Sequence, residues 1–348
     1  MSNNILVIGN GFDLAHGRKT KYSDFLEWIC NPNSEITDNN PSLLAEFRFP
    51  DYEKSSLMTY LISCYKNKSR INTWIDLELE LKVFIHNLDS LINSLNERDY
   101  STTVNIYNIT DCSVNVSNTF LINQLVSIFE LDSPGAKLIN EYIDIWWKID
   151  KQKIFETIQN ELIKLSQMLE FYLVDVEPLL SGTISKRSDI VDINPSYVIS
   201  FNYTDTIQEY YGVKSEDICY IHGKIKENNL VLGYDDSDGE TSDLQFKKYY
   251  QRLIYNTNKI DFRRFRDIDV FGDAGYSDIY FFGHSLDVSD KDILFKILML
   301  RNKIYIYYKD DEDKNRKIKN LISIIGKKGT ERRLSENIIF YKPKNVIS

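Results

Sequence analysis

The feature that most restricts the fold of this chain is a short, fully apolar run that ends in a glycine turn. Residues 5–8 read Ile-Leu-Val-Ile, and Gly9-Asn10-Gly11 follow at once. A strand that is apolar on both faces is typical of a parallel sheet covered by helices on both sides, whereas a half-exposed strand alternates apolar and polar residues. The opening therefore predicts a buried parallel strand followed by a tight strand-to-helix turn.

Short apolar runs of the same kind return in the second half of the chain, separated by segments with helical spacing. The expected strands cover residues 197–201, 218–221, 230–232, 278–282, 303–308 and 337–341. The helices expected between them cover residues 205–211, 244–265, 290–300 and 313–326. This alternation predicts an α/β fold with a parallel, Rossmann-like sheet.

Between the first strand and the others, the apolar residues take up the period of helices. The helical spacing runs through residues 57–65, 74–95 and 138–174, with polar, irregular connections at 31–50 and 99–117. We therefore expect a nucleotide-binding core made of residues 1–35 and 190–348, and a mostly helical insertion of residues 36–189.

Composition narrows the classes of partner. The formal net charge is −9, so the chain is a poor generic binder of phosphate backbones, and nucleic acid is not the expected partner. Neither a secretory signal nor an apolar run long enough to span a membrane is visible, which predicts a cytoplasmic protein without membrane contact. The four scattered cysteines are Cys30, Cys64, Cys112 and Cys219. They form no CxxC pair, so we expect free thiols and no zinc site.

Four polar clusters stand directly after expected strands, at residues 9–13, 202–205, 222–224 and 283–287. In open α/β sheets, ligands bind beyond the carboxyl ends of the strands, because loops and helix N-termini converge there. No single cluster is specific. Together they predict one crevice in which all four meet.

The glycine turn fits a diphosphate, but it also fits a turn without a ligand. Gly9 and Gly11 lack Cβ atoms, so the backbone can approach a phosphate closely and present N–H groups to it. Asp13 could accept from ribose hydroxyls or cap the following helix.

The later clusters offer an amide and several imidazoles. Asn202 could hold a ribose hydroxyl, orient a water, or satisfy backbone groups. His222 could take a proton from a hydroxyl, or it could be structural. His16 and His284 flank the glycine turns and rank second as ligand contacts, whereas Asp235 and Asp290 could be helix caps.

These motifs, in this order, resemble the bacterial abortive-infection AbiH family. The resemblance rests on residues 7–17 with Asp24-Phe25, and on residues 74–78, 200–204, 221–224, 232–235 and 283–286 with Asp290. The family often carries Leu-Pro where this sequence has Arg18-Lys19. The resemblance covers most of the chain and implies a role in antiphage defence.

The AbiH family in turn is distantly similar to sirtuins, which implies a sirtuin-like fold and NAD as the substrate. Carried over to this sequence, the residues that cleave the nicotinamide glycosidic bond fall on Asn202 and His222. The expected cofactor-binding residues are Gly9, Asn10, Gly11, Phe12, Asp13, His16, Thr204, Gly233, Gly283, His284, Ser285 and Asp290. The four-cysteine zinc module of deacetylating sirtuins is missing, so the resemblance implies the zinc-free branch that hydrolyses NAD.

The leading hypothesis is therefore an NAD glycohydrolase that releases nicotinamide and ADP-ribose. We expect a homo-oligomer that responds to a phage-derived trigger, with the helical insertion serving gating or oligomerisation. One alternative is a non-catalytic sensor that binds NAD or ADP-ribose and acts with a partner effector. The other is a metal-dependent nuclease, whose ligands would have to come from Asp13, Asp205, Asp235 and Asp290.

Overall fold

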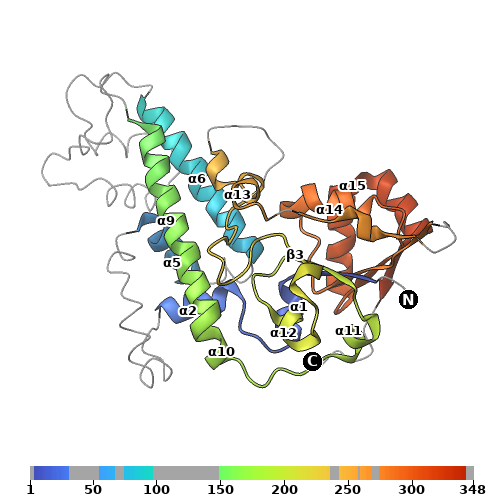
Figure 1. Ribbon diagram of the computed structural model, residues 1–348. Coiled ribbons are helices and arrows are strands. Elements are labelled where there is room, and N and C mark those ends of the chain that lie inside the picture. The colour runs from blue at the N-terminus through green and yellow to red at the C-terminus, as the bar shows by residue number, and fades with distance from the viewer. Residues whose placement is uncertain are drawn as a thin grey trace, which may run out of the picture.

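The computed structural model describes residues 4–30, 55–66, 74–96, 149–235, 243–257, 259–268 and 274–341. They form an α/β fold around a six-stranded parallel sheet (Figure 1). Its strands are β1 (Ile5–Ile8), β2 (Tyr197–Ser200), β3 (Ile218–Tyr220), β6 (Ile279–Phe282), β7 (Ile304–Tyr307) and β8 (Ile338–Tyr341). They lie in the order β3-β2-β1-β6-β7-β8. This is the Rossmann-like order, in which winding reverses between β1 and β6, and it confirms the predicted fold class.

Helices cover both faces of the sheet, which explains why β1 is apolar throughout. Val7 lies opposite Ile199 and Phe281 and faces α14 (Lys291–Leu298) and α15 (Asp311–Glu336). Ile8 faces the opposite layer, whose helices are α1 (Asn10–Ala15), α11 (Ser188–Ile193) and α12 (Thr206–Tyr211). The result is a three-layer sandwich with β1 at its centre.

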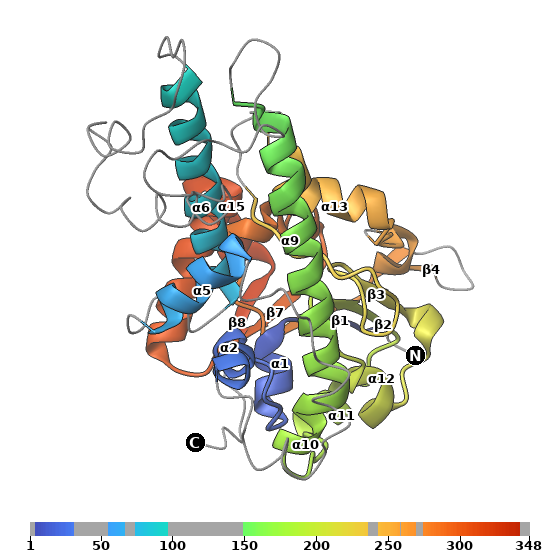
Figure 2. The ribbon, with the colours of Figure 1, turned by 90° about the vertical axis from the view of Figure 1, so that its left-hand side faces the viewer.

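Most of the chain between α1 and α11 forms a helical part beside the sheet, and Figure 2 shows this helical part from the front. Its elements are α2 (Tyr22–Cys30), α5 (Ser56–Lys66), α6 (Trp74–Asn96), α9 (Lys151–Phe171), a π-helical turn η4 (Tyr172–Val176) and α10 (Glu177–Leu180). Helix α5 packs against α2, α6 and α9. None of the helices in the described ranges combines the length and apolar character needed to cross a membrane.

The helical part shares its core with loops that follow the sheet strands. Tyr203, Tyr234 and Phe246 pack into the same apolar cluster as the buried side chains of α2, α5, α6 and α9. Domain boundaries at residues 35 and 190 stay a prediction. The irregular connections expected at 31–50 and 99–117, and the start of the helix expected at 138–174, lie outside the described residues.

Two sequence predictions in the second half are wrong. Residues 230–232 form no strand, because their backbone groups have other hydrogen-bond partners. The Leu232 backbone exchanges hydrogen bonds with the side-chain amide of Gln251, and the Val231 N–H donates to the backbone carbonyl of His222. The helix expected at 244–265 is broken into η6 (Leu244–Phe246), α13 (Lys248–Tyr255) and η7 (Phe262–Phe265). A left-handed Asn256, with φ of 57°, ends α13.

The remaining elements are short or extend the predicted ones. The structure adds a hairpin of β4 (Arg266–Ile268) and β5 (Ala274–Tyr276), and the 3-10 turns η5 (Ser215–Asp217) and η8 (Val288–Asp290). Helix α15 does not end at Gly326 but kinks there, since that glycine adopts a φ of 73°.

Candidate functional site

The turns after β1 and β6 pack directly against each other at the point where the winding of the sheet reverses. The Gly11 N–H donates to the Gly283 carbonyl at 2.8 Å. A Cβ on Gly11 would lie 2.7 Å from that oxygen, and a Cβ on Gly283, whose φ is +65°, would lie 2.1 Å from the Phe12 nitrogen. Glycine is therefore required here for close backbone packing. The sequence predicted that the Gly11 N–H would bind a diphosphate, but in the structure it donates to the Gly283 carbonyl.

Asn10 and Asp13, on the helix after this turn, are tied to later segments. The Asn10 side-chain oxygen accepts from Thr20 at 2.7 Å. Asp13 is buried, and its Oδ2 accepts from the Thr204 hydroxyl at 2.6 Å. Burial raises the pKa of Asp13 to about 6. Its Oδ1 is buried without a hydrogen-bond partner among the described residues.

The loop after α1 continues this buried network into the helical part. Arg18 donates to the Glu177 carboxylate at the start of α10 and to the Thr206 hydroxyl. Arg18 is 6% exposed and Glu177 is fully buried. The residue at which the sequence departs from the family pattern thus forms a buried ion pair that joins the β1 turn to α10.

His16 is held inside the structure by both ring nitrogens. Its Nδ1 donates to the Phe12 carbonyl at 2.7 Å, and its Nε2 accepts from the Tyr211 hydroxyl at 2.6 Å. A carbonyl only accepts, so Nδ1 carries a proton. Burial lowers the pKa of His16. The structure therefore gives this residue a packing role between α1 and α12.

Asn202 is the most unusual polar residue of the site. It directly follows β2 and is 4% exposed. Neither its amide nitrogen nor its amide oxygen has a hydrogen-bond partner among the described residues. A buried amide without partners costs free energy, and such groups in native proteins need an explanation.

His222 follows β3, and its imidazole packs against the segment that carries Asn202. Both chain neighbours of Asn202 contact this imidazole, since the ring centroids of Phe201 and Tyr203 lie 5.4 and 6.4 Å from it. The His222 Nε2 lies 2.9 Å from Asp290 Oδ1. An ionised carboxylate only accepts, so Nε2 carries the proton and Nδ1 is the basic nitrogen. Burial lowers the pKa of His222, against the opposing effect of Asp290.

His284 follows β6 and contacts the residue that follows β2. Its ring packs against Phe201 with a centroid distance of 4.4 Å, and its Nδ1 accepts from the Leu286 N–H at 2.9 Å. Leu286 has a φ of 57°, a costly conformation for a buried leucine that bends this turn back onto the imidazole. Burial lowers the pKa of His284 to about 4, so the ring is neutral at physiological pH.

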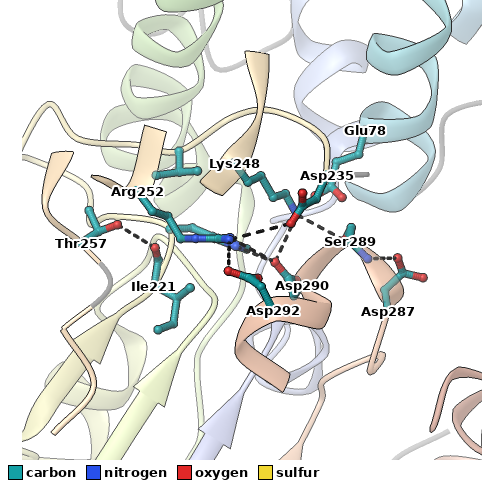
Figure 3. Close-up of polar contacts among 12 residues, drawn as sticks. Glu78, Ile221, Asp235, Lys248, Arg252, Thr257, Asp287, Ser289, Asp290 and Asp292 are labelled. Atoms are coloured by element: carbon teal, nitrogen blue, oxygen red, sulfur yellow. Dashed lines mark hydrogen bonds and ion pairs between the residues drawn. The ribbon is translucent and has the colours of Figure 1, made fainter. Parts of the chain in front are cut away.

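A group of buried charges surrounds Asp290 (Figure 3). The Lys248 Nζ lies 3.4 Å from Asp290 Oδ1 and contacts the Glu78 carboxylate of α6. Arg252 lies 3.8 Å from Asp290 and donates to Asp292 at 2.7 Å. Burial would raise the pKa of Asp290, but Lys248 and His222 hold it well below its usual range. Burial raises the pKa of Glu78 to about 7.

Sequence reasoning missed Lys248 and Arg252 as site residues and named Glu78 only within a family motif. Lys248 and Arg252 stand four residues apart and share one face of α13, where they are 2% and 1% exposed. Leu253 on the same helix is 59% exposed. Apolar side chains normally face the core, so the sequence of α13 predicts that Leu253 is buried and that the two cations are exposed. The structure has the reverse.

Three further residues that the sequence singled out lie near the site, and each contributes in a different way. A Cβ on Gly233 would lie 2.3 Å from the Phe246 carbonyl, so this glycine lets the segment before α13 approach closely. Ser285 is half-buried, and its carbonyl accepts from Asn320 at 3.2 Å. Asp235 lies near Arg252, and burial raises its pKa to about 6.

The four predicted clusters therefore meet, but among the described residues they form no open crevice around His222, which is only 7% exposed. A cavity of about 310 Å³ lies beside edge strand β3 and includes Gly223 and Lys224 in its lining, but not Asn202 or His222. In the described part of the chain, no group of three or more His, Cys, Asp or Glu side chains could hold a metal ion.

Comparison with known proteins gives one match. A family model described as bacteriophage abortive infection AbiH matches residues 5–309. That span includes every residue of the candidate site. Neither the curated proteins nor the solved structures contain a significant match.

Proposed function

The chain belongs to the bacteriophage abortive infection AbiH family, which places it in abortive infection, and we propose that it acts there by hydrolysing NAD. The observation that carries the proposal is the buried Asn202 amide without partners among the described residues. Its chain neighbours Phe201 and Tyr203 contact the imidazole of a His222–Asp290 pair at the carboxyl edge of a Rossmann-like sheet. Ligands of such sheets bind at the point where the winding reverses. That point lies between β1 and β6.

The side chains fit the needs of a ribose. A ribose hydroxyl both donates and accepts a hydrogen bond, and the Asn202 amide offers one free acceptor and a donor group. The free Oδ1 of Asp13 is a second acceptor, on the helix that follows β1. These unpaired atoms support a sugar-binding role for Asn202 and Asp13.

The reaction needs one proton acceptor. A water oxygen forms a bond to the anomeric carbon while the bond from that carbon to the nicotinamide nitrogen breaks, and the bonding pair leaves with neutral nicotinamide. The proton lost by the water passes to Nδ1 of His222, whose Nε2–H is held by Asp290. Asn202 fixes the sugar as positive charge develops on it. The products are nicotinamide and ADP-ribose.

The closed arrangement implies low activity at rest. His222 is 7% exposed, so substrate reaches its Nδ1 only after the covering elements move. Unchecked loss of NAD would harm the host cell, and a closed resting site fits control by infection. The same closure favours the second candidate, a sensor that binds NAD or ADP-ribose without turnover and signals to a partner.

The test is nicotinamide release from NAD by the purified full chain, and NAD content in cells before and during bacteriophage infection. We expect release, or loss of cellular NAD on infection, that disappears in His222→Ala and in Asn202→Ala. Asn93→Ala serves as the control, because Asn93 is exposed on α6, where its amide donates to Asp89, and the variant should keep the wild-type activity. Activity that survives in both site variants would refute the assignment. Tight binding of intact NAD without turnover in any condition would favour the sensor.

A further inference from the structure

The buried charges form a chain of contacts that starts on the helical part and ends on His222. Glu78 of α6 contacts Lys248 of α13, and Lys248 contacts Asp290 (Figure 3). Asp290 in turn accepts from His222. We propose that Lys248 is a positioning residue for His222: its ammonium fixes the Asp290 carboxylate on the imidazole, and Glu78 fixes the ammonium. The inference rests on the proposed function, in which His222 is the base.

The geometry leaves Lys248 little freedom. Its side chain is 3% exposed, and its Nζ has three acceptors: the Glu78 carboxylate, Asp290 Oδ1 at 3.4 Å and Ser289 Oγ at 3.3 Å. An ammonium group has three donors, so the three acceptors account for all of them. The three come from two elements, α6 and η8, and Lys248 therefore ties the helical part to the turn that carries Asp290.

Arg252 does not replace Lys248 in this role. Its guanidinium lies 3.8 Å from Asp290, whereas it donates to Asp292 at 2.7 Å. Asp292 is therefore its main partner. A buried carboxylate without a close cation is costly, so the nearer ammonium of Lys248 dominates the electrostatics of Asp290.

The ammonium of Lys248 acts on the pKa of His222, whereas Glu78 acts on the ammonium. The charged or titratable groups around the imidazole, its partner and His284 are Asp290, Lys248, Arg252, Glu78, Asp235, Asp292, Tyr203 and Lys317. Removing the ammonium of Lys248 leaves excess negative charge near the ring, which raises the pKa of His222. The pKa of Glu78 is about 7 and that of His222 is lowered, so Glu78 is largely protonated where His222 titrates, and Glu78→Gln removes little charge there. A second cation at position 248 would not restore the pKa of His222 if Lys248 were only a packing residue.

The experiment follows the histidine ring signals by NMR in the full chain with carbon-13-labelled histidine, with the His222 signal assigned from His222→Ala. We expect Lys248→Met to raise the pKa of His222 by about one pH unit and Lys248→Arg to restore it towards wild type, whereas Glu78→Gln should leave it near the wild-type value. Lys151→Met is the control, because Lys151 is a half-buried lysine paired with a carboxylate, Asp89, on another part of α6, and it should not move the His222 signal. An unchanged pKa of His222 in Lys248→Met, or no recovery in Lys248→Arg, would overturn the inference.

This readout separates the inference from the proposed function, because the titration needs no turnover. A raised pKa of His222 in Lys248→Met without nicotinamide release would uphold the positioning of His222 and reject NAD hydrolysis. Nicotinamide release with an unchanged pKa would do the reverse. If both hold, the acidic limb of the pH profile of kcat/KM moves to higher pH in Lys248→Met, since the free base is the active form. If Lys248→Met does not fold, Lys248→Gln, which also removes the charge, tests the same shift.

Discussion

Replacing Asn202 by leucine should make the protein more stable while it abolishes the proposed activity. Both polar atoms of this amide are buried without partners among the described residues. An unpaired buried polar group costs about 1–3 kcal/mol, and an apolar group of the same shape removes that cost. Leucine has the same branched outline as asparagine. We therefore expect Asn202→Leu to raise the free energy of unfolding by about 1–3 kcal/mol.

The matched control is Asn302→Leu, because Asn302 is also buried but its amide nitrogen has two hydrogen-bond acceptors. Its amide nitrogen donates to the carbonyls of Phe265 at 2.9 Å and Ser277 at 2.7 Å. Its replacement leaves two buried carbonyls unpaired and should cost about 2–4 kcal/mol. Urea unfolding of both variants measures the contrast. If Asn202→Leu lost stability to a similar degree as Asn302→Leu, the Asn202 amide would be a structural group, and the reasoning from its missing partners would fail.

Three further predictions address the scaffold of the site, each measured by urea unfolding. Gly283→Ala should lower the free energy of unfolding by at least about 3 kcal/mol, because φ is +65° and the new Cβ would lie 2.1 Å from a backbone nitrogen. Gly17→Ala, with φ of +83° and no described atom within 4 Å of the new Cβ, should lower it by about 1–2 kcal/mol. Equal losses would contradict the close packing of the turns. Replacing either Arg18 or Glu177 alone by an apolar residue should cost about 3–5 kcal/mol, and the double variant should recover most of it; additive losses would show that the two residues do not act as a pair. Burial raises the pKa of Asp13 from 3.8 to about 6, so the folded state binds more protons between these values and stability falls as the pH rises from about 4 to 7. Asp13→Asn should remove about 2 kcal/mol of that fall, and a variant with the wild-type slope would contradict the assignment.

The centre of the sheet could be predicted from the sequence because β1 and β2 are buried on both faces. The runs at 5–8 and 279–282 contain only apolar or aromatic residues, and a run of four residues that ends at a glycine is too short for a helix. The run at 230–232 has the same character but forms no strand. Its backbone is satisfied by the side chain of Gln251, a long-range contact that local sequence does not reveal.

The site was predictable in part for the same topological reason. Parallel strands end at one edge of the sheet, so residues that follow β2, β3 and β6 had to converge, and Phe201 indeed contacts both His222 and His284. Lys248 was not predictable, because α13 buries its charged face and exposes Leu253. That inversion depends on carboxylates from other elements, Glu78 among them, which offset the cost of burying a cation.

The position of bound NAD in a crystal of the His222→Ala variant tests the central claim most directly. The account predicts that the ribose next to nicotinamide lies against the Asn202 amide, at the meeting point of the turns after β1 and β6. NAD found instead in the cavity beside β3, or no NAD bound at millimolar concentration, would contradict it.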